Sequence, residues 1–208
     1  AFWTVISIAL AFVCMNFIAD VSDDESLSRL FEHIGSKYGH LDAAVNNASP
    51  KIMSQGAFQE IPAENLFSTL KSDFGSYVVC LQKELNLMDS GGCIVNVSSV
   101  NGLRPCPGAA MYSAAKHGLE GLTKSVALEA IQKGIRVNAV APGVTWTFRW
   151  EERENSNPNI RAEVEPQIPI KRFAIESEIV NAIEWLCSTK SSYVVGHTLV
   201  VDGGLSLS

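Results

Sequence analysis

The stretch IVNVSSVNGLRPCPGAAMYSAAK, residues Ile94–Lys116, decides how this sequence is interpreted, because both of its ends carry a signal. It begins with a β-branched run typical of a buried strand and continues into two hydroxyl residues, Ser98 and Ser99. It ends with Tyr112 and Lys116, which are four residues apart. Residues at that spacing share one face of a helix, so the phenol and the ammonium can meet.

A cation beside a phenol changes the acid–base chemistry of the phenol. A tyrosine ionises near a pH of about 10 unperturbed, and a nearby positive charge moves its pKa towards the working range. The pair Tyr112 and Lys116 alone would be a weak signal. Ser99, at the end of a predicted strand and thirteen residues before Tyr112, makes the combination far more specific.

Around this stretch, short apolar runs alternate with helical patterns, which is the signature of an α/β fold with a parallel sheet. The predicted strands are Met15–Val21, Asp42–Asn46, Gly92–Ser98, Ile135–Ala141 and Thr198–Val201. The predicted helices are Asp23–Lys37, Ala63–Met88, Ala109–Lys133 and Glu176–Ser188. Ser22 followed by Glu25 has capping-box spacing, which predicts Ser22 as the N-cap of the first helix, and Gly39 is expected to end that helix.

Composition limits the classes of protein that this chain can belong to. A length of 208 residues predicts one domain, 1–208, and 47% hydrophobic with 18% charged residues predicts a folded globular chain. A net charge of −6 without a basic run argues against nucleic acid as a partner. The five cysteines form no C-x-x-C pair and no metal-ligand spacing, so we expect reduced thiols in an intracellular, cytoplasmic protein without a metal site.

Two segments stand apart from the alternating pattern. Ala1–Ile18 is apolar and uncharged; it is predicted as buried strands or a buried helix, with a membrane anchor or a hydrophobic translation scar as less favoured alternatives. Thr145–Lys171 is polar with three prolines, and it predicts a mobile loop of the kind that forms lids. Its aromatic residues Trp146, Phe148 and Trp150 would either wall an apolar pocket or serve packing.

With these residues in view, the chain resembles the short-chain dehydrogenase/reductase family from about Asp20 to the C-terminus. The matching motifs are Asp20-Val21, Asn46-Asn47-Ala48, Asn96–Ser99, Tyr112 with Lys116, Pro142-Gly143 with Thr147, and Val201-Asp202-Gly203-Gly204. The resemblance implies a Rossmann-like, doubly wound parallel sheet. It also implies hydride transfer between NAD or NADP and a small alcohol or carbonyl substrate, as in carbonyl reductases, and we expect a homo-oligomer.

The family's roles carry over residue by residue. By resemblance, Tyr112 is the general acid/base, Ser99 positions the substrate oxygen, and Lys116 lowers the pKa of Tyr112 and holds the nicotinamide ribose. The remaining cofactor contacts implied are Asp20 and Val21 at the adenine, Asn47 and Ala48 on the adenosine side, and Pro142, Gly143, Thr145 and Thr147 at the nicotinamide end.

The glycine-rich phosphate loop of the family is missing from the 208 residues. Their 15 glycines contain no T-G-x-x-x-G-x-G or G-x-G-x-x-G spacing. About twenty residues lead up to Asp20-Val21, against roughly sixty in a complete mononucleotide-binding half. We therefore expect a fold that is N-terminally truncated relative to the family, with an atypical apolar segment at 1–19.

Two single positions also depart from the family. Ser72 stands where the resemblance expects an asparagine of the proton relay, and Ser49 follows Ala48 where glycine is usual. Three hypotheses stay open: an active oxidoreductase whose apolar N-terminus rebuilds part of the sheet, a catalytically impaired fragment or homologue, and a non-enzymatic partner that associates with full-length relatives.

Overall fold

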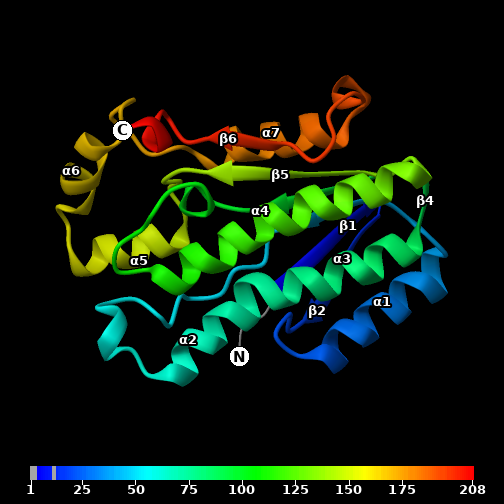
Figure 1. The fold of residues 1–208 in the computed structure, drawn as a ribbon, viewed down its shortest axis with the longest axis horizontal. Helices are drawn as coiled ribbons and strands as arrows, with labels where there is room; N and C mark the ends of the chain where they lie inside the picture. The colour runs from blue at the N-terminus through cyan, green and yellow to red at the C-terminus, as the bar shows by residue number, and fades with distance from the viewer. Residues whose placement is uncertain (1–3, 11–12) are drawn as a thin grey trace.

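Four parallel strands form the central sheet, in the order β3–β4–β5–β6. The computed structural model describes residues 4–10 and 13–208. The strands of this sheet are β3 (Leu41–Asn46), β4 (Met88–Val97), β5 (Arg136–Pro142) and β6 (Thr198–Val201), as Figure 1 shows. The pairs β4–β5 and β5–β6 are in regular parallel register. The register of β3 with β4 shifts between Leu41 and Ala43.

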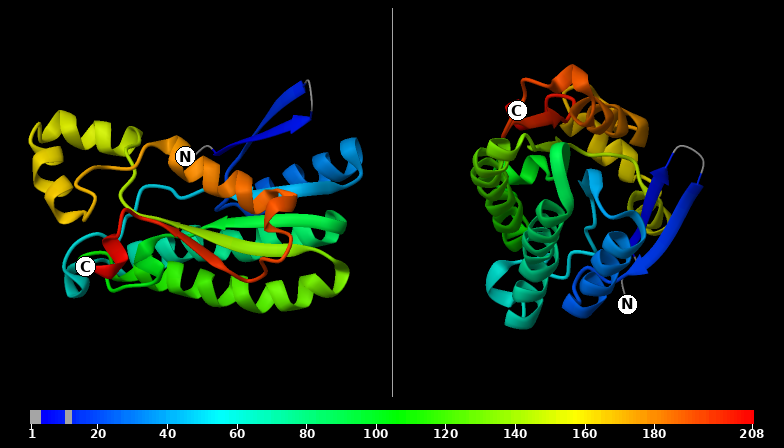
Figure 2. Two further views of the ribbon diagram at one scale, coloured as in Figure 1. Left: turned by 90° about the horizontal axis from the view of Figure 1, so that it is seen from above. Right: turned by 90° about the vertical axis from the view of Figure 1, so that its right-hand side faces the viewer.

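Helices cover both faces of this sheet, which makes it doubly wound. They are α1 (Asp24–Tyr38), α2 (Ala63–Leu70), α3 (Ser76–Leu87), α4 (Ala110–Ala130), α5 (Phe148–Ser156), α6 (Ile160–Val164) and α7 (Glu176–Cys187). Figure 2 shows α4 and α7 on opposite faces. The predicted Rossmann-like α/β architecture is therefore confirmed.

Apolar side chains between these layers form the core. On the α3/α4 face, Ile94 and Val137 of the sheet pack with Leu81 of α3 and Ala127 of α4. On the other face, Val95 and Val140 pack against Ile179 and Leu186 of α7. Alternate residues of β4 and β5 thus face opposite layers, as expected for parallel strands buried on both sides.

The strand predicted at Met15–Val21 is present but is not part of the parallel sheet. It is β2 (Val13–Ala19), which pairs antiparallel with β1 (Thr4–Leu10) in a separate two-stranded sheet. Figure 2 shows this hairpin projecting from the body of the molecule. The hypothesis that the apolar N-terminus rebuilds part of the parallel sheet is therefore wrong for the described residues.

The apolar segment Ala1–Ile18 is thus extended chain where it is described, and residues 1–3 and 11–12 lie outside the described part. Its last residue, Ile18, is exposed, so burial is not general along β2. Within residues 4–10 and 13–208, no helix is long and apolar enough to cross a membrane.

The start of α1 differs from the prediction by one residue. The N-cap is Asp23, whose carboxylate accepts hydrogen bonds from the backbone N–H groups of Glu25 and Ser26. Ser22, the predicted cap, instead donates its hydroxyl to Asp20. The predicted end of the helix is confirmed, because Gly39 is the C-cap with φ of 81°.

The segment predicted as a loop at Thr145–Lys171 contains secondary structure. It forms the two short helices α5 and α6 and a further helical turn at Glu165–Gln167. Trp146 and Trp150 each contact the ring of Phe173 edge-on with centroids 5.0 Å apart, whereas Phe148 is 68% exposed. Trp146 and Trp150 therefore anchor the segment by packing, whereas Phe148 does not, and the three do not form one pocket wall.

Candidate active site

The carboxyl ends of the four parallel strands lie at one edge of the sheet. Asn47 follows β3, Ser98 and Ser99 follow β4, Gly143 follows β5 and Asp202 follows β6. In open α/β sheets this edge is where ligands bind. The topology therefore gathers the predicted motifs on the side of the sheet where a site is expected.

The turn that carries Ser99 is fixed against helix α4 by close packing. The Ser99 hydroxyl accepts a hydrogen bond from the backbone N–H of Asn101 at 3.1 Å, and the Ser113 hydroxyl of α4 donates to the Asn101 carbonyl at 2.7 Å. A Cβ on Gly102 would lie 2.9 Å from the backbone carbonyl atoms of Lys116. Only glycine allows this approach, which sets Ser99 beside the first turns of α4.

Lys116 is one turn along α4 from Tyr112, and its side chain is 1% exposed. Its ammonium donates hydrogen bonds to the Tyr77 hydroxyl at 3.2 Å and to the Val97 carbonyl at 3.1 Å. Burial lowers the pKa of Lys116 to about 8, although the neighbouring carboxylates Asp73 and Glu120 act in the opposite direction. The ammonium is thus held in a dry, preformed position.

Tyr112 lies on the first turn of α4, and a hydrogen bond links it to Ser99. Its ring centroid lies 5.7 Å from the Lys116 ammonium. Burial, followed by the charge of Asp73, raises the pKa of Tyr112 to about 12, and the Ser99 hydrogen bond only partly offsets this. The net shift is thus upward, not downward as the Tyr112–Lys116 pair predicts, since desolvation of the phenolate dominates.

Asp73 is a buried carboxylate at this site that sequence reasoning missed. Its Oδ1 lies 3.9 Å from the Lys116 ammonium and accepts a hydrogen bond from the Ser49 hydroxyl at 2.6 Å. Ser72, the predicted relay position, donates its hydroxyl to Asp73 Oδ2 at 3.2 Å and to the Thr69 carbonyl. The carboxylate next to Lys116 on this helix is therefore that of Asp73.

The local backbone determines which side chains of this helix face α4. The predicted helix Ala63–Met88 is interrupted by a π-helical turn at Lys71–Gly75. A π turn adds a residue to the helical register, so the 3.6-residue period no longer tells which side chain faces α4. Ser49, which stands where the family usually has glycine, directs its hydroxyl to Asp73.

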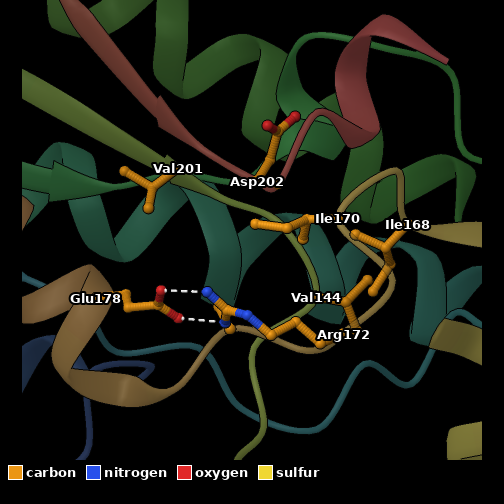
Figure 3. Close-up of a pocket in the computed structure, with 9 residues that line it drawn as sticks. Val144, Ile168, Ile170, Arg172, Glu178, Val201 and Asp202 are labelled. Atoms are coloured by element: carbon orange, nitrogen blue, oxygen red, sulfur yellow. Dashed lines mark hydrogen bonds and ion pairs between the residues drawn. The ribbon is translucent and has the colours of Figure 1, made fainter.

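A cavity lies at the ends of β5 and β6, but it is separate from the three catalytic candidates. It has a volume of about 100 Å³, and Figure 3 shows it beside the ion pair of Arg172 with Glu178. Ligand pockets usually measure about 300–1,000 Å³, so this cavity is too small for a dinucleotide or a drug-sized substrate. Ser99, Tyr112 and Lys116 do not line it.

Comparison of the sequence with known proteins identifies one family. The sequence profile of the enoyl-(acyl carrier protein) reductase family matches residues 7–206. The A-factor type γ-butyrolactone 1'-reductase of Streptomyces virginiae is 36% identical over 200 residues, which cover 91% of this chain and 75% of the relative. The chain is a short-chain dehydrogenase/reductase.

Solved structures of this family superpose closely on the fold. Levodione reductase has a TM-score of 0.84 at 32% identity, and the match covers 91% of this chain and 76% of the enzyme. ElxO with NADP bound has a TM-score of 0.85 at 30% identity, with 91% of this chain and 77% of ElxO covered. The chain thus spans about three-quarters of the length of these relatives.

On the nicotinamide side of the expected cofactor site, the predicted residues lie together. Pro142 ends β5, and a Cβ on Gly143 would lie 2.6 Å from the Cα of Asp202, so glycine is required where the two strand ends meet. Thr145 pairs with Ala174 in a parallel bridge, and Thr147 is the N-cap residue of α5. These residues follow β5, next to the strand that leads to Ser99.

The residues predicted for the adenosine side are arranged less tightly. Asp20 lies between β2 and α1, and its Oδ1 accepts hydrogen bonds from the hydroxyl and the backbone N–H of Ser22. Val21 is buried in the cluster around α1, and Ala48 packs against the same cluster. Asn47 follows β3 and is exposed. One oxygen of the Asp20 carboxylate is therefore occupied within its own loop.

Proposed function

We propose that this short-chain dehydrogenase/reductase is an NAD(P)-dependent oxidoreductase that interconverts an alcohol and a carbonyl, with Tyr112 as the acid/base. The convergence of Ser99, Tyr112 and Lys116 carries the proposal. Ser99 comes from the end of β4, and the other two residues come from the first turns of α4. Gly102 brings these two elements into contact.

The geometry supports a division of roles among these three side chains. The Tyr112 phenol donates its proton to the carbonyl oxygen in reduction and accepts it from the alcohol in oxidation. The Ser99 hydroxyl hydrogen-bonds the same substrate oxygen and positions it. Because Tyr112 has a pKa of about 12, the phenol is protonated at neutral pH and is ready to act as an acid.

The residues present fit the nicotinamide–ribose end of a dinucleotide. An ammonium has three donors, and Lys116 uses two of them on the Tyr77 hydroxyl and the Val97 carbonyl. The third makes no hydrogen bond within the described residues, although the Asp73 carboxylate lies 3.9 Å away, and it would hold a ribose hydroxyl. The Gly143–Thr147 loop lies on the neighbouring strand end. When bound, the cofactor supplies the hydride. Relatives with NADP bound, such as ElxO, support NAD or NADP as this cofactor.

A second candidate function is a homologue that associates with relatives and does not bind a cofactor. Two observations favour it: the 208 residues contain no glycine-rich phosphate loop, and β3 is open on one side. Ala43 and Val45 of β3 are exposed, Val45 by 45%, although parallel strands are normally covered on both faces.

One titration separates these two functions. NADPH and NADH are added to the protein while energy transfer from its four tryptophans to the reduced nicotinamide is recorded. Saturable binding supports the oxidoreductase, and no binding of either cofactor at millimolar concentration sinks it. Turnover is then measured with a panel of small ketones that includes levodione. Tyr112→Phe should abolish turnover and leave cofactor binding largely intact.

The proposal extends to the setting and the assembly of the protein. The free thiols of Cys80, Cys93, Cys106 and Cys187 support a reducing, intracellular compartment such as the cytoplasm. Apolar side chains exposed on α7 and the edge strand β6, including Trp185 and Val200, support a homo-oligomer. Light scattering after size-exclusion chromatography gives the mass in solution, and a monomer at micromolar concentration would contradict the oligomer.

A further inference from the structure

Asp73 is an unusual neighbour for a tyrosine that must exchange a proton. Its side chain is 1% exposed, and it belongs to the π-helical turn between α2 and α3. A carboxylate is expensive to bury unless charges and donors compensate it. Here the compensation comes from the Lys116 ammonium at 3.9 Å and from the hydroxyls of Ser49 and Ser72.

Packing holds the π turn, and Asp73 with it, against α4. A Cβ on Gly118 would lie 3.2 Å from the Phe74 ring, so this glycine leaves room for the residue after Asp73. On the other side, the Ser49 hydroxyl reaches Asp73 from the loop after β3, and the Arg149 guanidinium of α5 hydrogen-bonds the Ser49 carbonyl. Four segments thus fix the carboxylate in place.

The charge of this carboxylate opposes that of Lys116 at the phenol. An isolated ammonium beside Tyr112 would favour the phenolate. A buried aspartate in contact with the ammonium makes the pair neutral overall, and the phenol then stays in its uncharged form. Both effects follow from geometry: Asp73 raises the pKa of Lys116 and also that of Tyr112.

Other ionisable groups face the same place, and they act differently. Glu120 of α4 raises the pKa of Lys116, whereas Arg149 of α5 lowers the pKa values of both Lys116 and Tyr112. Cys106, before α4, raises that of Tyr112. Tyr77 of α3 hydrogen-bonds the ammonium. Among these groups, Asp73 is the carboxylate that acts on Tyr112 and Lys116 together.

We propose that Asp73 is a positioning residue that neutralises Lys116 and keeps Tyr112 a phenol, which sets the site for proton donation to a carbonyl. The inference rests on the proposed role of Tyr112 as acid/base. Under it, the chain favours carbonyl reduction at neutral pH, and alcohol oxidation becomes efficient only at alkaline pH. The asparagine that the family resemblance expects on this helix would carry no such charge.

The test is a spectroscopic titration of tyrosinate in the protein without cofactor or substrate. Each protein is compared with its own Tyr112→Phe counterpart, and the difference isolates Tyr112 among the four tyrosines. We expect Asp73→Asn to raise the ionisation constant of Tyr112 by about tenfold or more, that is, to lower its pKa by at least one unit. Glu120→Gln, which removes a buried carboxylate that acts on Lys116, should leave the Tyr112 midpoint within about threefold.

A double variant keeps the test sharp if Asp73→Asn alone disturbs folding, which circular dichroism reports. Replacing a buried ion pair as a whole is often tolerated, so Asp73→Asn with Lys116→Met should fold. Because Lys116, with a pKa of about 8, is already neutral where Tyr112 ionises, this double variant loses only the Asp73 charge and should lower the Tyr112 midpoint as Asp73→Asn does. Equal Tyr112 midpoints in the wild type and a folded Asp73→Asn protein would overturn the inference. So would a Tyr112 midpoint in the folded double variant equal to that of the wild type.

The readout also separates this inference from the proposed function. The titration needs no turnover. If the protein reduces no ketone but Asp73→Asn shifts the Tyr112 midpoint, the oxidoreductase proposal fails and the electrostatic role of Asp73 stands. A protein that reduces ketones without a shift loses only the role of Asp73. In an active enzyme, Asp73→Asn should move the onset of alcohol oxidation to lower pH by the same interval as the titration midpoint.

Discussion

The Lys116 ammonium lies 3.2 Å from the Tyr77 hydroxyl, a direct hydrogen bond, whereas it lies 5.7 Å from the ring centroid of Tyr112. The Tyr77 hydroxyl also donates to the Val97 carbonyl at 3.1 Å. Tyr77 is thus a buried link between α3, β4 and the catalytic lysine candidate. Lys116 is positioned before any ligand arrives.

Tyr77→Phe should destabilise the fold. The substitution removes the hydroxyl that accepts from the ammonium, and a lost hydrogen bond to a charged group costs about 1.5–3 kcal/mol. Urea unfolding at pH 7 measures the loss directly. Tyr193→Phe is a surface control, because Tyr193 is fully exposed, and an unfolding free energy for Tyr77→Phe equal to that of this control would contradict the assigned link.

Gly102→Ala should separate the Ser99 turn from α4. The added Cβ would lie 2.9 Å from backbone atoms of Lys116, so the turn must move, at a cost of about 1–3 kcal/mol in stability. A shift of this size displaces Ser99 from the substrate oxygen, and we expect turnover to fall by about 100-fold.

Gly121→Ala is the matched control for Gly102→Ala, since a Cβ at Gly121 meets nothing within 4 Å. In the middle of α4 it should stabilise the protein by up to about 1 kcal/mol through helix propensity. The unfolding free energies of the two variants should therefore change in opposite directions, and only Gly102→Ala should lower turnover. Similar turnover in both would refute the packing role of Gly102.

The local sequence pattern was sufficient to predict strands and helices whose positions do not depend on which element they pair with. Thr198–Val201 is predicted residue for residue, and the other strands of the parallel sheet agree to within a few residues, because their apolar runs have no alternative arrangement. The pairing of β2 with β1 was missed, since strand pairing depends on distant contacts that a periodicity does not encode.

In the candidate site, too, the features that depend on local sequence were predicted and those that depend on tertiary contacts were not. Ser99, Tyr112 and Lys116 were found from spacing alone, and the structure brings them together. Asp73 was missed because its ion pair with Lys116 is a contact between elements far apart in the sequence, and the direction of the Tyr112 pKa shift was missed because burial is a tertiary property. At α1, adjacent Ser22 and Asp23 are both good caps, and the sequence cannot choose between them.

Lys116 should give the reduction reaction an alkaline limit. With a pKa of about 8, its ammonium is present below that pH and is lost as the pH rises through it. We therefore expect kcat/KM for ketone reduction to be level at pH 6–7 and to fall above about pH 8. Lys116→Arg, whose guanidinium stays charged, should be less active but lack this limb. If kcat/KM falls above about pH 8 in both proteins, the fall is caused by a group other than Lys116.

Glu84 should make the fold less stable as the pH rises from about 4.5 to about 7. Its carboxyl group is buried, accepts a hydrogen bond from the Asn46 side chain at 3.0 Å, and has its pKa raised by burial from 4.5 to about 7. The folded state therefore holds this proton more tightly than the unfolded state. Linkage then means that its contribution is fully present below pH 4.5 and is lost as the pH rises through 7.

Glu84→Gln isolates that contribution, because glutamine keeps the acceptor for Asn46 and cannot ionise. At pH 5 the wild type is mostly protonated at Glu84, so the two proteins should unfold at similar urea concentrations. At pH 8 the wild type must bury a carboxylate, and the variant should be more stable by roughly 2–3 kcal/mol. A stability difference between the two proteins that does not change from pH 5 to pH 8 would show that Glu84 is already ionised in the fold, with the Asn46 hydrogen bond outweighing its burial.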